Sequence, residues 1–174
     1  MKISIRALCG EDWPLVSKIY LEGIKTGKAT FQTDCPSYED WDKSHIKSCR
    51  LVALIDDTVA GWAALSPVSS RCVYNGVAEV SIYIGEEYRG KGVGKLLLSS
   101  LIAASEQAGF WTLQSGIMQD NEASIHLHEQ CGFRMVGYRE RIGKDRLGVW
   151  RNNVLMERRA IADEVGGVSI CCQK

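Results

Sequence analysis

The feature that most constrains this chain is an alternating strand that leads directly into a glycine loop and a helix start. Residues 78–84 (AEVSIYI) alternate in the manner of a half-buried strand. The next segment, 86–98 (EEYRGKGVGKLLL), has glycine at every second position from 90 to 94. Because glycine lacks a Cβ atom, several backbone N–H groups can point into one small volume, where a helix N-terminus adds partial positive charge. The segment therefore predicts a phosphate or pyrophosphate site, with Arg89 and Lys91 beside it.

Two other phosphate-binding patterns do not fit this loop. A P-loop needs G-x-x-x-x-G-K followed by Ser or Thr, but Arg89 stands at the first glycine position and Leu96 follows Lys95. A dinucleotide fingerprint needs G-x-G-x-x-G, whereas this loop reads G-x-G-x-G. The spacing alone also leaves open a plain glycine-rich turn between a strand and a helix.

The loop resembles the acyl-CoA loop of the GNAT acyltransferase superfamily, whose pattern (Gln/Arg)-x-x-Gly-x-(Gly/Ala) is filled by Arg89, Gly92 and Gly94. A second segment, 119–133 (QDNEASIHLHEQCGF), is similar to the superfamily's second half, with an asparagine, a short helix and a Gly-Phe pair. The resemblance covers roughly residues 1–159. Within the superfamily, the chain most resembles the phosphinothricin and L-amino-acid N-acetyltransferase branch, on the segments 29–41, 78–84, 123–133 and 146–159.

Length and charge restrict the class of protein. The 174 residues suffice for one domain with its own core. Lysine plus arginine equals aspartate plus glutamate at 21 each, which argues against a general binder of nucleic acids or membrane surfaces. No apolar run is long enough for a transmembrane helix, and the N-terminus lacks the apolar core of a signal peptide. We expect a cytoplasmic protein with a single domain over 1–160 and a flexible tail over 161–174.

The seven cysteines are scattered and form no C-x-x-C pair, which argues against a disulfide framework and against zinc. Most are expected to be reduced, small apolar residues. Cys171 and Cys172 lie in the predicted tail, where exposure would make them reactive. We expect no bound metal.

Strand and helix patterns follow one another along the chain. Alternating or apolar runs predict strands at 2–7, 51–55, 59–65, 78–84, 113–118, 134–141 and 147–158. Helical spacing predicts one helix after Asp12 and others at 37–48, 92–108 and 121–131. This order indicates an α/β protein with a mixed sheet and helices on its faces. The resemblance implies the GNAT fold, with about seven mostly antiparallel strands, about four helices, and a splay between the fourth and fifth strands for the pantetheine arm.

Acyl transfer to an amine needs a proton acceptor, because a free α-amine is mostly protonated at neutral pH. Glu79 is the candidate base, since it interrupts a strand of apolar and small residues and matches a glutamate of the family. Exposure on the polar side of the strand is the alternative. His128 stands where many superfamily members have a tyrosine. Its imidazole could assist the departing thiolate, or it could simply pack beside Cys131 and Phe133.

The resemblance assigns the coenzyme to three segments. Backbone groups of the central strand would bind the pantetheine amides, because strand groups at a gap lack a strand partner. The glycine loop would bind the pyrophosphate, and the start of the next short helix would bond the pantetheine arm. These residues are Ile82, Tyr83, Ile84, Arg89, Gly90, Lys91, Gly92, Val93, Gly94, Asn121 and Ser124. Asn121 also suits the N-cap of its helix, and the two roles are compatible.

An amino-acid acceptor carries a carboxylate, which favours a forked contact with arginine. Arg71 and Tyr74 match the family segment that faces the acceptor, and Phe31 would form a wall of the pocket. Trp150 is assigned to the same pocket or to a subunit interface, and core packing is the alternative for both Phe31 and Trp150. Where the family often has Trp-x-Asp, this chain has asparagine at 152, so the family's acceptor contacts are not fully retained.

Together these features predict an acetyl-CoA-dependent N-acetyltransferase acting on the amine of a small amino acid or analogue, such as phosphinothricin or methionine sulfoximine. No cysteine stands in a recognisable nucleophile setting, so the amine is expected to attack the thioester directly in a ternary complex. The alternatives are a protein N-terminal or ribosomal-protein acetyltransferase, a polyamine or aminoglycoside acetyltransferase, and a non-catalytic acyl-CoA-binding module. The resemblance also implies a homodimer, and we expect no nucleic-acid or membrane partner.

Overall fold

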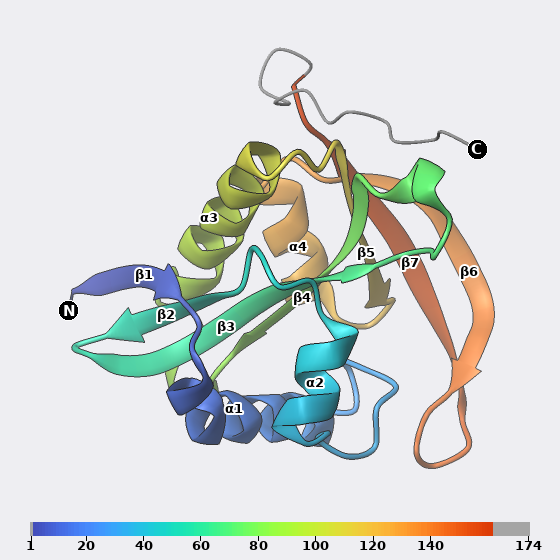
Figure 1. Ribbon diagram of the computed structural model, residues 1–174. Coiled ribbons are helices and arrows are strands. Elements are labelled where there is room, and N and C mark those ends of the chain that lie inside the picture. The colour runs from blue at the N-terminus through green and yellow to red at the C-terminus, as the bar shows by residue number, and fades with distance from the viewer. Residues whose placement is uncertain (1, 162–174) are drawn as a thin grey trace.

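A seven-stranded mixed sheet with helices on both faces forms the centre of the protein (Figure 1). The computed structural model describes residues 2–161. The strands are β1 (Ile3–Ala7), β2 (Leu51–Ile55), β3 (Thr58–Pro67), β4 (Val77–Ile84), β5 (Thr112–Met118), β6 (Arg134–Lys144) and β7 (Trp150–Arg159). The α-helices are α1 (Trp13–Lys25), α2 (Tyr38–Ser44), α3 (Val93–Gln107) and α4 (Glu122–Gln130). The order across the sheet is β1-β2-β3-β4-β5-β7-β6.

Neighbouring strands are antiparallel except β4 and β5, which run parallel. These two strands pair over only three residues each, ending where Glu79 lies opposite Gln114. Beyond that pair, β4 continues to Ile84 beside β3, and β5 continues to Met118 beside β7. The two strands therefore diverge, and the backbone groups that face the gap have no strand partner. The predicted GNAT fold, including this splay, is confirmed.

Side chains of β4 alternate between the two faces of the sheet, and each face has its own packed region. Ala78 and Val80 pack with the apolar face of α3. On the other side of the sheet, Tyr83 packs against an aromatic cluster formed by α1, α2 and β3, whose rings are Tyr20, Trp41 and Trp62. Because side chains alternate along a strand, Glu79 projects to the same side as Tyr83. Figure 1 shows α1 and α2 below the sheet and α3 and α4 above it.

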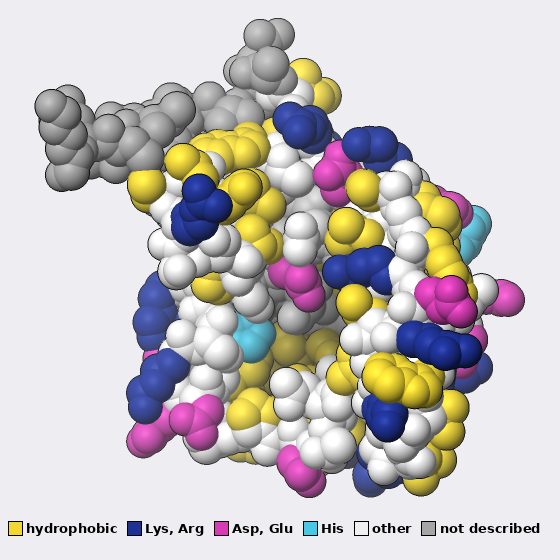
Figure 2. All heavy atoms as spheres, turned by 90° about the vertical axis from the view of Figure 1, so that its right-hand side faces the viewer, with side chains coloured by type: hydrophobic (Ala, Val, Ile, Leu, Met, Phe, Trp, Pro, Cys, Tyr) yellow, Lys and Arg dark blue, Asp and Glu magenta, His cyan; other side chains and the backbone are white. Residues whose placement is uncertain are grey.

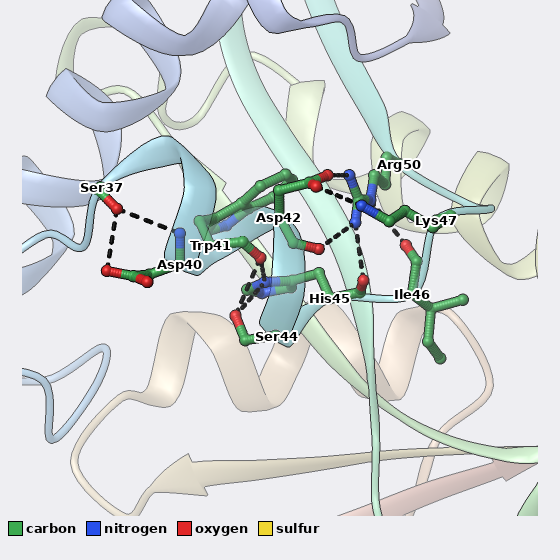
Figure 3. A network of polar contacts seen from close by, with 9 residues as sticks. All are labelled: Ser37, Asp40, Trp41, Asp42, Ser44, His45, Ile46, Lys47 and Arg50. Atoms are coloured by element: carbon green, nitrogen blue, oxygen red, sulfur yellow. Dashed lines mark hydrogen bonds and ion pairs between the residues drawn. The ribbon is translucent and has the colours of Figure 1, made fainter.

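Helix α2 is shorter than the sequence predicts, since it ends at Ser44 and the backbone is extended at His45. Arg50 accounts for the difference (Figure 3). Its guanidinium donates hydrogen bonds to the carbonyl oxygens of Asp42, His45 and Ile46, which fixes this segment in an irregular path. The backbone N–H of Ile46 also donates to β3 at 2.8 Å. The predicted helix over 37–48 is therefore wrong in its last turn, because these contacts replace helical ones.

The turn of the β6–β7 hairpin lies at 145–149, whereas the predicted strands at 134–141 and 147–158 place the turn before residue 147. Asp145 holds it, because its carboxylate accepts hydrogen bonds from the backbone N–H groups of Leu147 and Val149 at 2.9 and 3.0 Å. Aspartate commonly fixes turns in this way, by bonding to backbone groups just ahead of it in the chain. Leu147 and Val149, predicted as strand residues, belong to the turn.

Several expectations lie partly or wholly outside these observations. No helix among residues 2–161 is long and apolar enough to cross a membrane. Nearly all of the predicted tail, including Cys171 and Cys172, lies outside the described residues. The domain boundary at 160, the cytoplasmic location and the homodimer stay predictions.

Candidate active site

The glycine loop between β4 and α3 presents open backbone at the start of a helix. Gly90 and Gly92 have positive φ angles of 72° and 80°, and a Cβ added to either would meet no atom within 4 Å. Gly92 is the N-cap of the 15-residue helix α3 and has no side chain with which to cap it. The N–H groups of the first turn therefore lack a capping side chain, and the helix adds its partial positive charge there. This geometry suits a phosphate or pyrophosphate.

A cavity of about 500 Å³ lies between this loop, the end of β4 and the start of α4. We call it the loop cavity. Its lining includes Ile82, Tyr83, Ile84, Tyr88, Arg89, Gly90, Gly92, Gly94, Lys95, Asn121 and Ser124. The part of β4 that lines it is the part without a partner on β5, so the cavity joins an anion site to an open strand edge.

A second cavity of about 640 Å³ adjoins the first across the gap between β4 and β5. We call it the sheet cavity. Its lining includes Phe31, Asp40, His45, Glu79, Gly116, Met118, His128, Arg139 and Asn153. Both cavities are lined by Lys28, Ala29, Ile82, Tyr83, Asn121 and Ser124, so they share a wall. Figure 2 looks onto a hollow with an acidic side chain at its centre, a histidine beside it and a basic side chain across from it.

Glu79 lies where β4 and β5 part. Its Oε2 accepts a hydrogen bond from Gln114 Nε2 at 3.1 Å, and its side chain is exposed within the lining of the sheet cavity. The carboxylate is therefore held in place by one amide and still accessible from the cavity. It can accept a proton from a group bound there, directly or through a water molecule.

His128 places a buried imidazole ring at the wall of the sheet cavity. Its ring is 1% exposed, and Nδ1 lies 2.8 Å from the carbonyl oxygen of Ser124. A carbonyl oxygen only accepts, so the proton sits on Nδ1 and Nε2 carries a lone pair. Nε2 has no hydrogen-bond partner among the described residues. Burial lowers the pKa of His128 below its usual value, which favours the neutral ring.

The sequence matches a known protein family and its members. Residues 13–133 match the model of the Acetyltransferase (GNAT) family. The chain belongs to this family. It is 31% identical over 161 residues to phosphinothricin N-acetyltransferase of Alcaligenes faecalis, an alignment that covers 89% of this chain and 81% of that protein.

Two solved structures share the GNAT fold of this chain. One is a ribosomal-protein-alanine N-acetyltransferase from Brucella melitensis, with a TM-score of 0.84, 26% identity, and coverage of 90% of this chain and 99% of that one. The other is a GNAT superfamily phosphinothricin acetyltransferase from Sinorhizobium meliloti in complex with AcCoA, with a TM-score of 0.82, 30% identity, and coverage of 91% and 89%. The chain is thus an acetyl-CoA-dependent N-acetyltransferase of GNAT type.

Most residues predicted to hold the coenzyme of a GNAT enzyme line the loop cavity. Lys91 and Val93 are not among its lining residues; Lys91 Nζ lies 5.7 Å from the centroid of the Tyr88 ring, and the Val93 side chain is buried in the core. Asn121 is the N-cap of α4, where its Oδ1 accepts the backbone N–H of Ser124 at 3.2 Å.

Of the four residues predicted to bind the acceptor, one lines a cavity and three line neither. Phe31 lines the sheet cavity and packs close to Gly143, where an added Cβ would lie 3.1 Å from its ring. Arg71 and Tyr74 lie together in an exposed turn before β4, with 5.8 Å from the guanidinium carbon to the ring centroid. Trp150 is exposed at the start of β7. Neither cavity is lined by Arg71, Tyr74 or Trp150, so nothing in the geometry of the two cavities supports their predicted role.

Sequence reasoning missed several lining residues. Lys95 could have been found, because it follows the last loop glycine and belongs to the first turn of α3. Arg139 and Asn153 gave no local signal, since they come from the two strands of a long hairpin and meet only in the folded sheet. Among residues 2–161, no three His, Cys, Asp or Glu side chains gather as a metal site would require.

We expect His128 to be neutral at pH 7, with its proton on Nδ1. Its pKa is lowered from 6.5 by burial, so the uncharged ring persists as the pH falls through 6.5 and protonates only below that value. Nitrogen NMR of labelled histidine across this range measures both the tautomer and the titration, and a His128→Asn variant assigns the signal. A charged ring at neutral pH, or a proton on Nε2, would contradict this assignment.

Proposed function

We propose that the protein transfers the acetyl group of acetyl-CoA to the primary amine of a small amino acid or amino-acid analogue. The observation that carries the proposal is the meeting of the two cavities at the gap between β4 and β5. The loop cavity has an anion-binding helix start, and the sheet cavity holds the accessible carboxylate of Glu79. A thioester reaching through the gap would meet an amine beside a proton acceptor.

The loop cavity fits coenzyme A in two ways. The unpaired edge of β4 at 82–84 offers N–H and C=O groups, with which pantetheine amides pair as a neighbouring strand would. Gly90 and Gly92 leave open space in which a pyrophosphate approaches the backbone, and Arg89 and Lys95 supply positive charge. Arg89 is oriented by a hydrogen bond of 3.2 Å from its Nε to the carbonyl oxygen of Ile84.

We expect Gly92→Ala to raise the KM for acetyl-CoA by about tenfold or more, because its Cβ enters the space that the pyrophosphate needs and a left-handed alanine costs about 1–2 kcal/mol. The matched control is Gly148→Ala in the β6–β7 turn, where φ is 77° and no atom lies within 4 Å of the added Cβ. The control carries the same backbone strain far from the loop. Steady-state kinetics and calorimetry with acetyl-CoA compare the two variants. Equal KM values for both would remove the loop from coenzyme binding.

The proposed reaction is a direct transfer in a ternary complex. The amine nitrogen attacks the thioester carbonyl carbon, the C–S bond breaks, and coenzyme A leaves as a thiolate that takes up a proton. Glu79 accepts the proton that the amine loses, directly or through water. A role for His128 as the acid requires a proton on Nε2, which the buried position of the ring disfavours.

Cysteine positions support direct transfer over an acetyl-enzyme. None of the cysteines within residues 2–161 lines either cavity. A covalent intermediate needs a nucleophile within reach of the thioester and a base beside it.

The loop that forms one wall of the sheet cavity favours a small acceptor. Lys28, Ala29, Thr30, Phe31 and Gln32 supply consecutive lining residues from one loop, and the phosphinothricin acetyltransferase relatives act on an amino-acid analogue by name. A protein N-terminus needs an open groove along which the chain can leave. Acetyltransferases of ribosomal proteins and of polyamines are the alternative classes, so the test below includes short peptides and polyamines as acceptors.

We expect Glu79→Gln to lower kcat/KM by about 100-fold, which is at the low end of acid–base catalysis. Thiol release from acetyl-CoA is measured with phosphinothricin, methionine sulfoximine, other amino acids, polyamines and short peptides. The matched control is Glu157→Gln, which removes a carboxylate on β7 that pairs with Arg134 and lines neither cavity. Turnover confined to peptides or polyamines would overturn the proposed acceptor class, and an active Glu79→Gln enzyme would remove Glu79 from catalysis. Binding of acetyl-CoA without thiol release for any amine would indicate a binding module.

A further inference from the structure

Arg139 extends from β6 toward the sheet cavity across the neighbouring strand. In the sheet register, Arg139 pairs with Asn153 on β7, and Asn153 pairs with Met118 on β5. Side chains of directly paired residues share one face of a sheet. All three residues line the sheet cavity, so this row leads from the edge strand to the gap beside β4.

The guanidinium of Arg139 is positioned but has no carboxylate partner among the described residues. Its Nε donates to Asn153 Oδ1 at 2.9 Å, and Asn153 is only 6% exposed. Four other arginines of this hairpin do have such partners: Arg134 with Glu157, Arg141 with Glu140, Arg151 with Asp120 and Asp145, and Arg158 with Glu106. The single contact of Arg139 uses Nε and leaves both Nη groups as donors.

Gly116 on β5 provides the space in which these donors meet. A Cβ added at Gly116 would lie 3.1 Å from an Nη of Arg139 and 3.1 Å from Nδ2 of Asn153. Asn153 Oδ1 already accepts from Arg139, so its Nδ2 is a donor as well. Two donor groups, one of them charged, therefore converge above a residue that has no side chain.

We propose that Arg139 and Asn153 form the subsite that binds the carboxylate of the acceptor amino acid. This inference rests on the proposed function. An arginine and an amide donor in one place suit the two oxygens of a carboxylate. The subsite takes the role that the sequence assigned to Arg71, which lines neither cavity.

The position of the subsite relative to Glu79 fits an α-amino acid. Gly116 lies two residues beyond Gln114, the partner of Glu79, which corresponds to about 7 Å along the strand. An amine is two bonds from its carboxylate carbon, so a carboxylate above Gly116 places the amine about 2.5 Å nearer to Glu79. The remaining distance, about 4.5 Å along the strand, is longer than a direct hydrogen bond and suits contact with the Glu79 carboxylate through one water molecule. A polyamine, in contrast, would bring positive charge against Arg139.

The test compares two acceptors that differ only in charge: L-methionine sulfoximine and its carboxamide. We expect Arg139→Leu to raise the KM for the amino acid by about 10- to 100-fold with little change in kcat, because a charge-assisted contact made in the ground state is lost. The KM for the carboxamide should stay within about threefold, so the preference for the acid disappears. Arg139→Lys keeps the positive charge but loses the forked geometry, so its KM for the amino acid should lie between those of the wild type and Arg139→Leu.

A glycine pair supplies a second test that leaves Arg139 in place. Gly116→Ala puts a methyl group 3.1 Å from both donors and should also raise the KM for the amino acid. Gly137→Ala on β6 is the matched control, since its Cβ would meet no atom within 4 Å. We expect wild-type kinetics for Gly137→Ala and an unchanged KM for acetyl-CoA in all of these variants.

Calorimetry with L-methionine sulfoximine and the enzyme saturated with coenzyme A separates this inference from the proposed function. Wild-type turnover together with an unchanged acid preference in Arg139→Leu would overturn the subsite and leave the function standing. Wild-type binding without acetyl transfer, lost in Arg139→Leu, would support the subsite and overturn the function. The absence of both binding and turnover in the wild-type enzyme would overturn the subsite and the proposed function together.

Discussion

The divergence of β4 and β5 is the constraint on which the rest of the site depends. After three paired residues, each strand keeps its outer partner and leaves backbone N–H and C=O groups facing a gap. Each such group needs a partner, and each hydrogen bond made there contributes about 0.5–1.5 kcal/mol. A ligand that carries amides can therefore enter as a short substitute strand. Glu79 lies in the last residue pair before the strands part, where that ligand would end and where the cavities meet.

The walls of the sheet cavity come from segments far apart in the sequence, and a few contacts hold them in register. Asn121 Nδ2 donates to the carbonyl oxygen of Lys28 at 3.1 Å, which ties α4 to the loop after α1. The ring of Phe31 lies against Gly143 of β6, so the same loop also rests on the edge hairpin. On the side of α2, Arg50 fixes the chain that carries His45 into the cavity lining. The sheet cavity is thus walled by tertiary contacts, while the anion-binding part of the loop cavity comes from one continuous strand, loop and helix.

That difference explains how far the sequence could lead. The glycine loop, the open strand and the N-cap at Asn121 are local patterns, and their positions in the fold follow from a few residues each. Arg139 depends on the register of β6 against β7, which shifts between Arg139 and Gly143, and no sequence period reveals such a shift. Segment similarity points to Arg71, but this residue lies in a turn before β4 and lines neither cavity. The identity of His128 was accessible from sequence, whereas its tautomer follows from one carbonyl oxygen, that of Ser124.

The wall that the two cavities share has a consequence for the order in which substrates bind and products leave. Ile82, Tyr83, Asn121 and Ser124 border both spaces, so a pantetheine arm along β4 would itself become part of the surface against which the second substrate rests. An amine arriving before the coenzyme would find one side of its pocket missing. The architecture thus favours a compulsory sequence of addition, in which the thioester enters first, the acetylated amide departs next, and the spent thiol is the last to leave.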